Sequence, residues 1–187
     1  MRLALQSMFK EHPPRTESGR MSLSYPEETN LAHNPLDLLE EIVGANDWPH
    51  ERASGEELAV EISGRWCDYR LFFMWQENMS ALHFTSLFES RVGIDRQSEI
   101  HHLLALINEK LWLGHFDLSS EESTPMFRHT LLLRGAGAAS VEQLEDLVDV
   151  AISESDRYYP AFQFVIWGGK SAEEAMATAL IEVAGSA

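Results

Sequence analysis

The amino-acid sequence predicts an α+β fold, in which helices pack on one face of a five-stranded antiparallel sheet. Between residues 57 and 89, runs of alternating apolar and polar residues follow one another at short spacing, which favours antiparallel neighbours. Between Ser140 and Trp167, apolar residues recur at helical spacing and form a stripe wide enough to cover a sheet. Three or four predicted helices are too few to cover both faces, so one face should stay free of helices.

The predicted elements follow the order α-β-β-β-α-β-β-α-α along the chain. The strands are expected at residues 57–63, 66–76, 81–89, 115–119 and 126–134. The helices are expected at residues 35–44, from about 95 or 97 to 113, at 140–167, and from 171 onward. Ser140 and Ser171 are predicted N-caps, and Gln143 completes a capping box with Ser140. Pro160 is expected to kink the long helix, because proline has no amide hydrogen and its ring crowds the carbonyl of Asp156.

The composition is that of an acidic protein with a single cysteine. The 187 residues include 14 Lys and Arg against 30 Asp and Glu, a formal net charge of −16. This charge disfavours nucleic acid and anionic membrane surfaces as partners, since both are bound through excess Lys and Arg. Cys67 has no second cysteine in the chain with which to form a disulfide, which favours a cytoplasmic setting. No apolar run reaches the roughly 18 residues that a membrane-spanning helix needs.

Two regions are predicted along the chain. Residues 1–33 are expected to be a flexible tail, because they contain several prolines and show no sustained periodicity. Met21 is an alternative start, and residues 1–20 would then be an upstream extension of the reading frame. Residues 34–187 are expected to form one domain of ordinary size.

The sheet face away from the helices is the predicted partner surface. An apolar sheet face without a covering helix is usually a surface for a partner or a second copy. Arg157, a cation beside Pro160, is expected to pair with Asp156 or Asp68, or to hold a carboxylate of a partner. The candidate partner-binding residues are therefore Phe72, Met74, Leu87, Arg70 and Arg157.

Several segments together resemble one bacterial family. They are the run from Asp156-Arg157-Tyr158-Tyr159-Pro160 to Ala175, the start Asn34-Pro35-Leu36-Asp37 with Trp48 after it, the strand around Tyr69-Arg70, and the stretch from Asn108 to Phe116. From about Leu31 to Gly185 the chain resembles the YbjN-domain proteins of proteobacteria, often described as sensory transduction regulators, whereas its first 20 to 30 residues depart from their pattern. The resemblance implies a fold similar to that of type III secretion chaperones, commonly dimeric. It implies a binding or regulatory module and supplies no catalytic residues.

No catalytic, cofactor-binding or metal-binding residues are predicted. Glu99, His101 and His102 lie on one helix, but adjacent histidines point about 100 degrees apart and no known zinc spacing is present. Cys67 lies in the densest apolar strand, where a buried, unreactive thiol is expected. The run Gly168-Gly169-Lys170-Ser171 lacks the strand context and the earlier glycine of a phosphate loop, so a helix end and a new N-cap are expected.

Two hypotheses about function stay open. In the first, the protein is a non-enzymatic regulatory or chaperone-like module in bacterial signalling or stress response, a homodimer that binds a protein or peptide client. In the second, it is a small-ligand sensor or a small enzyme, with a pocket at the Pro160 kink lined by Tyr158, Tyr159, Arg157 and a histidine. The uncovered sheet face, the acidic charge and the lack of a catalytic pattern in the sequence favour the first.

Overall fold

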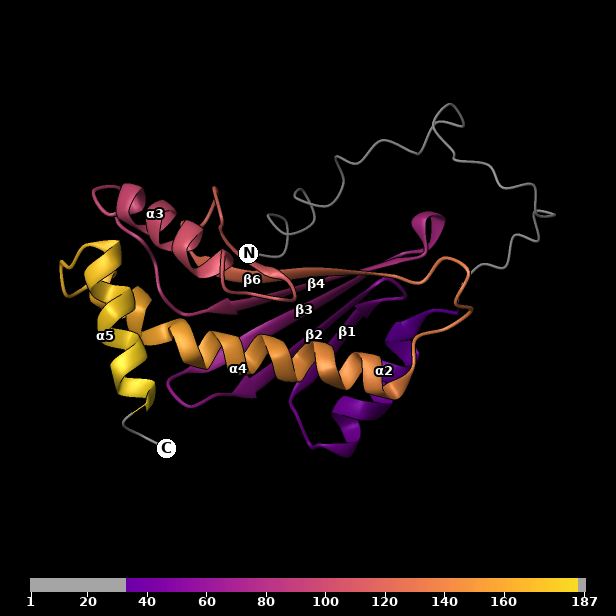
Figure 1. Cartoon of the computed structure of the whole chain (residues 1–187). Helices are drawn as coiled ribbons and strands as arrows, with labels where there is room; N and C mark the ends of the chain where they lie inside the picture. Colours follow the sequence, from indigo (N-terminus) through magenta and orange to yellow (C-terminus); the bar gives the residue numbers. More distant parts are fainter. Residues whose placement is uncertain (1–32, 185–187) are drawn as a thin grey trace, which may run out of the picture. The chain divides into compact units, whose positions relative to one another are not determined.

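Residues 33–184 are described by a computed structural model, with side chains up to residue 179, and they contain one antiparallel sheet (Figure 1). Its strands are β1 (His50–Ser54), β2 (Glu57–Ser63), β3 (Asp68–Gln76), β4 (Ala81–Phe88), β5 (His115–Leu118) and β6 (Pro125–Leu132). The helices are α2 (Pro35–Ala45), α3 (Gln97–Asn108), α4 (Val141–Ile166) and α5 (Ala172–Ala184), and η2 (Glu77–Met79) is a 3-10 turn. The predicted tail up to residue 32 and the alternative start at Met21 lie outside the described residues.

The α+β class is confirmed, but the predicted number of five strands is wrong. The sheet has six strands in the spatial order β1-β2-β3-β4-β6-β5, and the prediction lacks β1. Most side chains of β1 are exposed at the sheet edge, so no alternation of apolar and polar residues marks this strand in the sequence. It is held instead by its pairing with β2 and by Arg52, which lies 3.1 Å from Asp37 and 3.3 Å from Glu40 of α2.

The helix predicted to reach residue 113 ends earlier, since α3 stops at Asn108. The Asn108 side chain accepts a hydrogen bond from the amide of Phe116 (2.8 Å) and donates one to its carbonyl (3.0 Å). These two bonds hold β5 against the end of the helix. Trp112 lies beyond the end of this helix and is 76% exposed.

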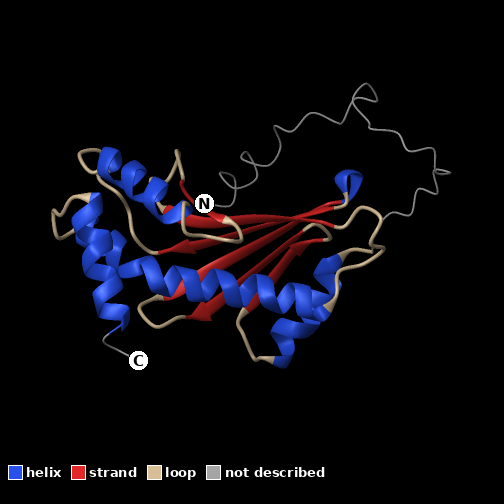
Figure 2. Cartoon of the chain, in the orientation of Figure 1, coloured by secondary structure: helices blue, strands red, loops and turns tan. Residues whose placement is uncertain are grey.

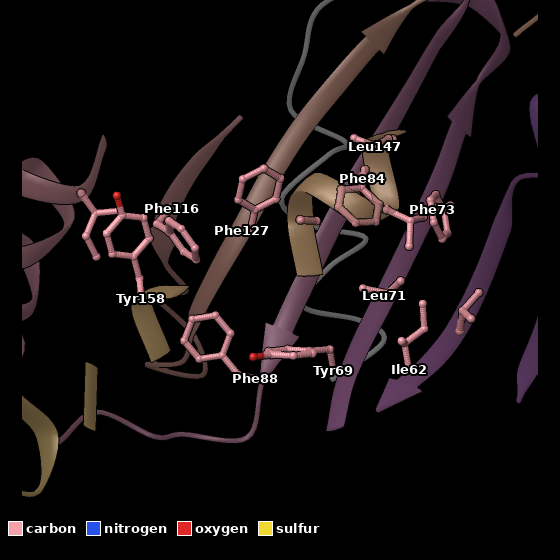
Figure 3. Packing of buried hydrophobic residues seen from close by; sticks show 14 of the residues in the cluster. Ile62, Tyr69, Leu71, Phe73, Phe84, Phe88, Phe116, Phe127, Leu147 and Tyr158 are labelled. Carbon is pink, nitrogen blue, oxygen red and sulfur yellow. The ribbon is translucent and has the colours of Figure 1, made fainter. Parts of the chain in front are cut away.

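The described helices pack on one face of the sheet, as predicted. Figures 1 and 2 show α4 lying across the strands on one side. We call this the inner face; its β3 residues Tyr69, Leu71, Phe73 and Trp75 belong to a core cluster with residues of each described α-helix. Figure 3 shows Phe84 and Phe127 of the neighbouring strands in this cluster, with Leu147 of α4 near Phe84. The opposite face is called the outer face below.

Local signals position α4 and α5 as predicted. The capping box is present: the Gln143 amide donates to Ser140 Oγ (3.2 Å) and the Ser140 amide donates to Gln143 Oε1 (3.0 Å). From there α4 continues as one helix through Pro160. Ser171 is the N-cap of α5 and accepts a hydrogen bond from the Glu174 amide (3.3 Å).

Candidate functional site

The predicted partner surface lies on the outer face, where the strand register arranges side chains in rows. The rows across β3, β4 and β6 are Phe72-Thr85-Arg128, Arg70-Leu87-Met126 and Met74-His83-Thr130. Phe72, Met74, Leu87 and Arg70 therefore share one face, as their spacing along the strands predicts.

These residues are not equally accessible. Phe72 and Met74 are half-buried, whereas Leu87 is only 7% exposed. In its row Leu87 stands between the longer side chains of Arg70 and Met126. Leu87 and Met126 are both buried, yet neither belongs to the core cluster of the inner face. The prediction that Leu87 is exposed is wrong, whereas Phe72 and Met74 are partly accessible apolar side chains of this face.

The cations of the outer face lie beside carboxylates. Arg70 is 3.5 Å from Glu61 of β2 and 3.8 Å from Glu89 beyond the end of β4. Arg128 of β6 is 3.1 Å from Asp117 of β5. Partly exposed pairs of this kind each contribute about 0–1 kcal/mol to stability. Their main consequence is that opposite charges are matched around the apolar side chains.

Arg157 does not lie on this surface, because α4 packs against the inner face. Its guanidinium is 3.6 Å from Glu154 and lies 5.3 Å from the ring centroid of Tyr158. The predicted pairing with Asp156 or Asp68 is wrong, because both carboxylates have other partners. Asp68 accepts a hydrogen bond from a serine hydroxyl of β2 (2.7 Å), and Asp156 holds the loop between β2 and β3.

The contact between Asp156 of α4 and the loop between β2 and β3 is called the clasp below. Its residues are Gly64, Arg65, Trp66, Tyr69 and Asp156. The Asp156 carboxylate accepts the Arg65 amide through both oxygens (3.0 and 3.1 Å) and the Tyr69 hydroxyl (2.7 Å). The Asp156 carbonyl accepts the indole N–H of Trp66 (2.9 Å). Burial raises the pKa of Tyr69, and its hydrogen bond to Asp156 raises that pKa further. One residue of α4 thus holds several points of the β2–β3 loop.

Pro160 explains why the Asp156 carbonyl is available to Trp66. In an α-helix this carbonyl would accept the amide hydrogen of the residue four positions later, but that residue is Pro160, which has none. The indole N–H supplies the missing donor. The Asp156–Pro160 spacing is a sequence signal that a carbonyl needs another partner, although nothing local identifies Trp66 as that partner.

Gly64 allows the loop to approach α4 this closely. A Cβ atom on Gly64 would overlap the ring of Tyr69 and lie 2.9 Å from Asp156 Oδ1. Because Tyr69 is fully buried, its ring has no free space into which it could move. The clasp therefore requires glycine at this position.

A groove lies between α4, β2 and the turn after α2. It has a volume of about 450 Å³. Its lining residues are Trp48, Ile62, Val148, Asp149, Ile152, Ser153 and Asp156. Large apolar side chains and carboxylates therefore meet here, and the clasp residue Asp156 is part of the lining.

The groove is not the pocket predicted at Pro160, whose expected tyrosines are packed into the core. Tyr158 contacts Phe116 edge-on, with ring centroids 6.1 Å apart, and Tyr159 contacts Phe88 in the same way at 6.1 Å (Figure 3 shows Tyr158 beside Phe116). Burial raises the pKa of both tyrosines. Two of the side chains expected to line the predicted pocket therefore pack against aromatic rings of the core instead.

The other polar side chains considered in the sequence have structural contacts. His102 lies 3.5 Å from Glu173 of α5, and Glu99 accepts a hydrogen bond from the Ala172 amide (3.0 Å). Within residues 33–184, no group of three or more histidine, cysteine or acidic side chains is placed to bind a metal. Cys67 is half-buried, and burial raises its pKa, which disfavours the nucleophilic thiolate. None of the described helices has both the length and the apolarity to cross a membrane.

The sheet with its single helical layer and the clasp at Asp156 define a small α+β domain. The family model of YbjN, described as "Putative bacterial sensory transduction regulator", matches residues 35–164, and the chain belongs to this family. The matched residues include every strand of the sheet and the clasp. A crystal structure of YbjN from E. coli, described as "a putative transcription regulator", is similar with 12% identity and a TM-score of 0.48, over 67% of this chain and 89% of that chain. The comparison with curated proteins found no match.

Proposed function

We propose that this protein is a non-enzymatic regulatory module that acts by binding other proteins through the outer face of its sheet. The description of the YbjN family as sensory transduction regulators supports a regulatory role. The observation that carries the proposal is the outer face itself. Phe72 and Met74 are half-buried apolar side chains on a face against which none of the described helices packs.

A second copy of the chain is the occupant we expect first. Each chain carries a net charge of −16, so two copies should meet where carboxylates lie beside arginines. The outer face offers this arrangement, with Arg70 and Arg128 next to acidic partners. An apolar centre with polar surroundings is the usual anatomy of a protein interface. A client protein would need the same apolar side chains, so we expect client binding and dimerisation to compete.

A catalytic role has less support from the geometry. The residues whose pKa is raised by burial are Cys67, Tyr69, Tyr158 and Tyr159. None of them lines the groove, where a catalytic group would meet a substrate. Asp156 does line it, but its carboxylate already accepts the hydrogen bonds of the clasp.

Light scattering after size-exclusion chromatography tests the proposal. Phe72→Asp places a charge in the apolar part of the outer face. Ile94→Asp makes the same kind of change at a residue that is 83% exposed in the loop before α3. We expect the wild type and Ile94→Asp to have twice the chain mass of 21.2 kDa, and Phe72→Asp to have the monomer mass with nearly unchanged thermal unfolding. A monomeric wild type contradicts the dimer, and a Phe72→Asp variant that fails to fold means that Phe72 belongs to the core.

A further inference from the structure

The groove beside α4 has features that the outer face does not share. Its floor is apolar, with Trp48, Ile62, Val148 and Ile152 among its lining residues. Asp149 borders it from the exposed side of α4. It opens on the inner-face side of β2, so a ligand bound there would not cover Phe72 or Met74.

Ile62 lines the groove from β2, and the end of this strand is only partly paired with β1 among the described residues. The register pairs β1 with β2 only as far as Val60, and one further bond joins the Glu61 amide to the Pro49 carbonyl (2.8 Å). Pro49 has no amide hydrogen, so it cannot donate to Glu61 in return. The next residue whose backbone points to the same side is Ser63, two positions along. Beyond the Glu61 amide, the groups of β2 that face this side are the Glu61 carbonyl and the backbone of Ser63, which leave a short stretch of edge to which an extended chain can add.

The charge beside this edge is negative. Glu145, Asp146 and Asp149 are exposed on α4, in a chain whose net charge is −16. Asp149 borders the groove and makes no ion pair within the described part of the chain. The carboxylate of Asp156 is already occupied by the clasp. Asp149 is thus the acidic group best placed to receive a cation from a ligand in the groove.

We propose that this groove binds an extended basic peptide segment of another protein. One apolar side chain of the segment enters the floor formed by Ile62 and Ile152. Alternate side chains of an extended chain share one face, so a lysine or arginine two residues away reaches Asp149. The backbone of the segment pairs with the open edge of β2.

The probe is a capped peptide, Lys-Ser-Leu-Ser-Lys, which has its leucine and both lysines on one face when extended. Two control peptides replace either the lysines with glutamate or the leucine with serine. Binding to the isotope-labelled full chain is followed through backbone amide chemical shifts, which register weak affinity and locate the site. We expect shifts around Ser63 and Ile152 with the first peptide, and binding weaker by about fivefold or more with either control.

Two matched variants separate a defined site from diffuse attraction. Asp149→Lys reverses the charge at the groove, and Asp146→Lys makes the same change on the same helix at a residue that does not line it. We expect Asp149→Lys to weaken the lysine peptide by about fivefold or more, and Asp146→Lys by less than about twofold. Phe72→Asp should leave this binding unchanged, so the test is independent of the outer face.

Several results would overturn the proposal. Equal weakening by both variants would show attraction to the whole acidic helix rather than to the groove. Equal binding of the glutamate peptide, or shifts remote from Ser63 and Ile152, would also reject it. The proposal would also be rejected if, without peptide, the shifts of these residues changed with protein concentration and Asp149→Lys abolished that change. The occupant of the groove would then be a second copy of the chain.

Discussion

Replacing Trp66 with phenylalanine tests whether the clasp compensates for the proline in α4. The indole N–H of Trp66 donates to the Asp156 carbonyl at 2.9 Å, and Pro160 leaves this carbonyl without its helical donor. Phenylalanine keeps an aromatic ring beside Arg65, whose guanidinium lies 5.0 Å from the Trp66 ring centroid. The substitution therefore removes the donor and retains most of the packing.

The expected loss follows from one hydrogen bond. A typical intramolecular hydrogen bond contributes about 0.5–1.5 kcal/mol to the free energy of unfolding. Trp66 is 44% exposed, so water can replace part of the lost interaction and the lower half of that range applies. A loss of about 1 kcal/mol lowers the Tm of a domain of this size by roughly 2–4 °C.

A second substitution makes the argument specific. Alanine at position 160 supplies the amide hydrogen that Pro160 lacks, so the Asp156 carbonyl regains its helical donor. Trp66→Phe should then cost less in the Pro160→Ala background than in the wild type. The difference between the two costs is a coupling energy, which we expect to be about 0.5–1 kcal/mol.

Urea denaturation followed by far-UV circular dichroism measures all four proteins of this cycle. Trp112→Phe is the matched control, because Trp112 is 76% exposed and makes no hydrogen bond within the described part of the chain. We expect this control to be within about 0.5 kcal/mol of the wild type. The explanation fails if Trp66→Phe costs the same free energy with and without Pro160, or no more than Trp112→Phe.

Two further predictions concern the core. Gly64→Ala should destabilise the protein by at least about 1–3 kcal/mol, since its Cβ overlaps the buried ring of Tyr69, whereas Gly55→Ala, with nothing within 4 Å of its Cβ, should be nearly neutral in the same denaturation assay. Burial lowers the pKa of His129 in the folded protein, and the nearby His115 lowers it further. The unfolded chain therefore binds a proton at His129 more readily than the folded protein does. The free energy of unfolding should accordingly fall as the pH drops below about 6.5. His129→Gln should reduce this loss in melting curves between neutral and mildly acidic pH, and an unchanged pH dependence would show that His129 does not contribute.

Much of the fold could be predicted because its signals are local. The bounds of β2 agree with the predicted range 57–63, since alternation along a strand directly reports which face is buried. The capping box at Ser140 involves residues only three apart. In contrast, β1 buries neither face and carries no such signal. The end of α3 depends on the bonds between Asn108 and Phe116, which only the return of β5 creates.

The candidate site was only partly predictable for the same reason. The period of two along β3 places Phe72 and Met74 on one face, and the structure agrees. Leu87 is buried beside Met126 of β6, and β6 is not the neighbour of β4 in sequence. Trp66 lies in the loop before β3 and contacts Asp156 on α4. No spacing in the sequence indicates that these two residues are in contact.

The sequence by itself determined the α+β class, the caps of the helices and the side-chain faces of the central strands. These properties depend on residues within a few positions of one another, so periodicity and capping patterns record them. Only the tertiary structure decided that β4 pairs with β6 and leaves β5 at the edge, that the clasp completes α4, and that a groove lies beside Asp149. Those features arise from contacts between segments that are distant in sequence. Local patterns are compatible with more than one arrangement of such segments, and the packing of the whole domain selects one of them.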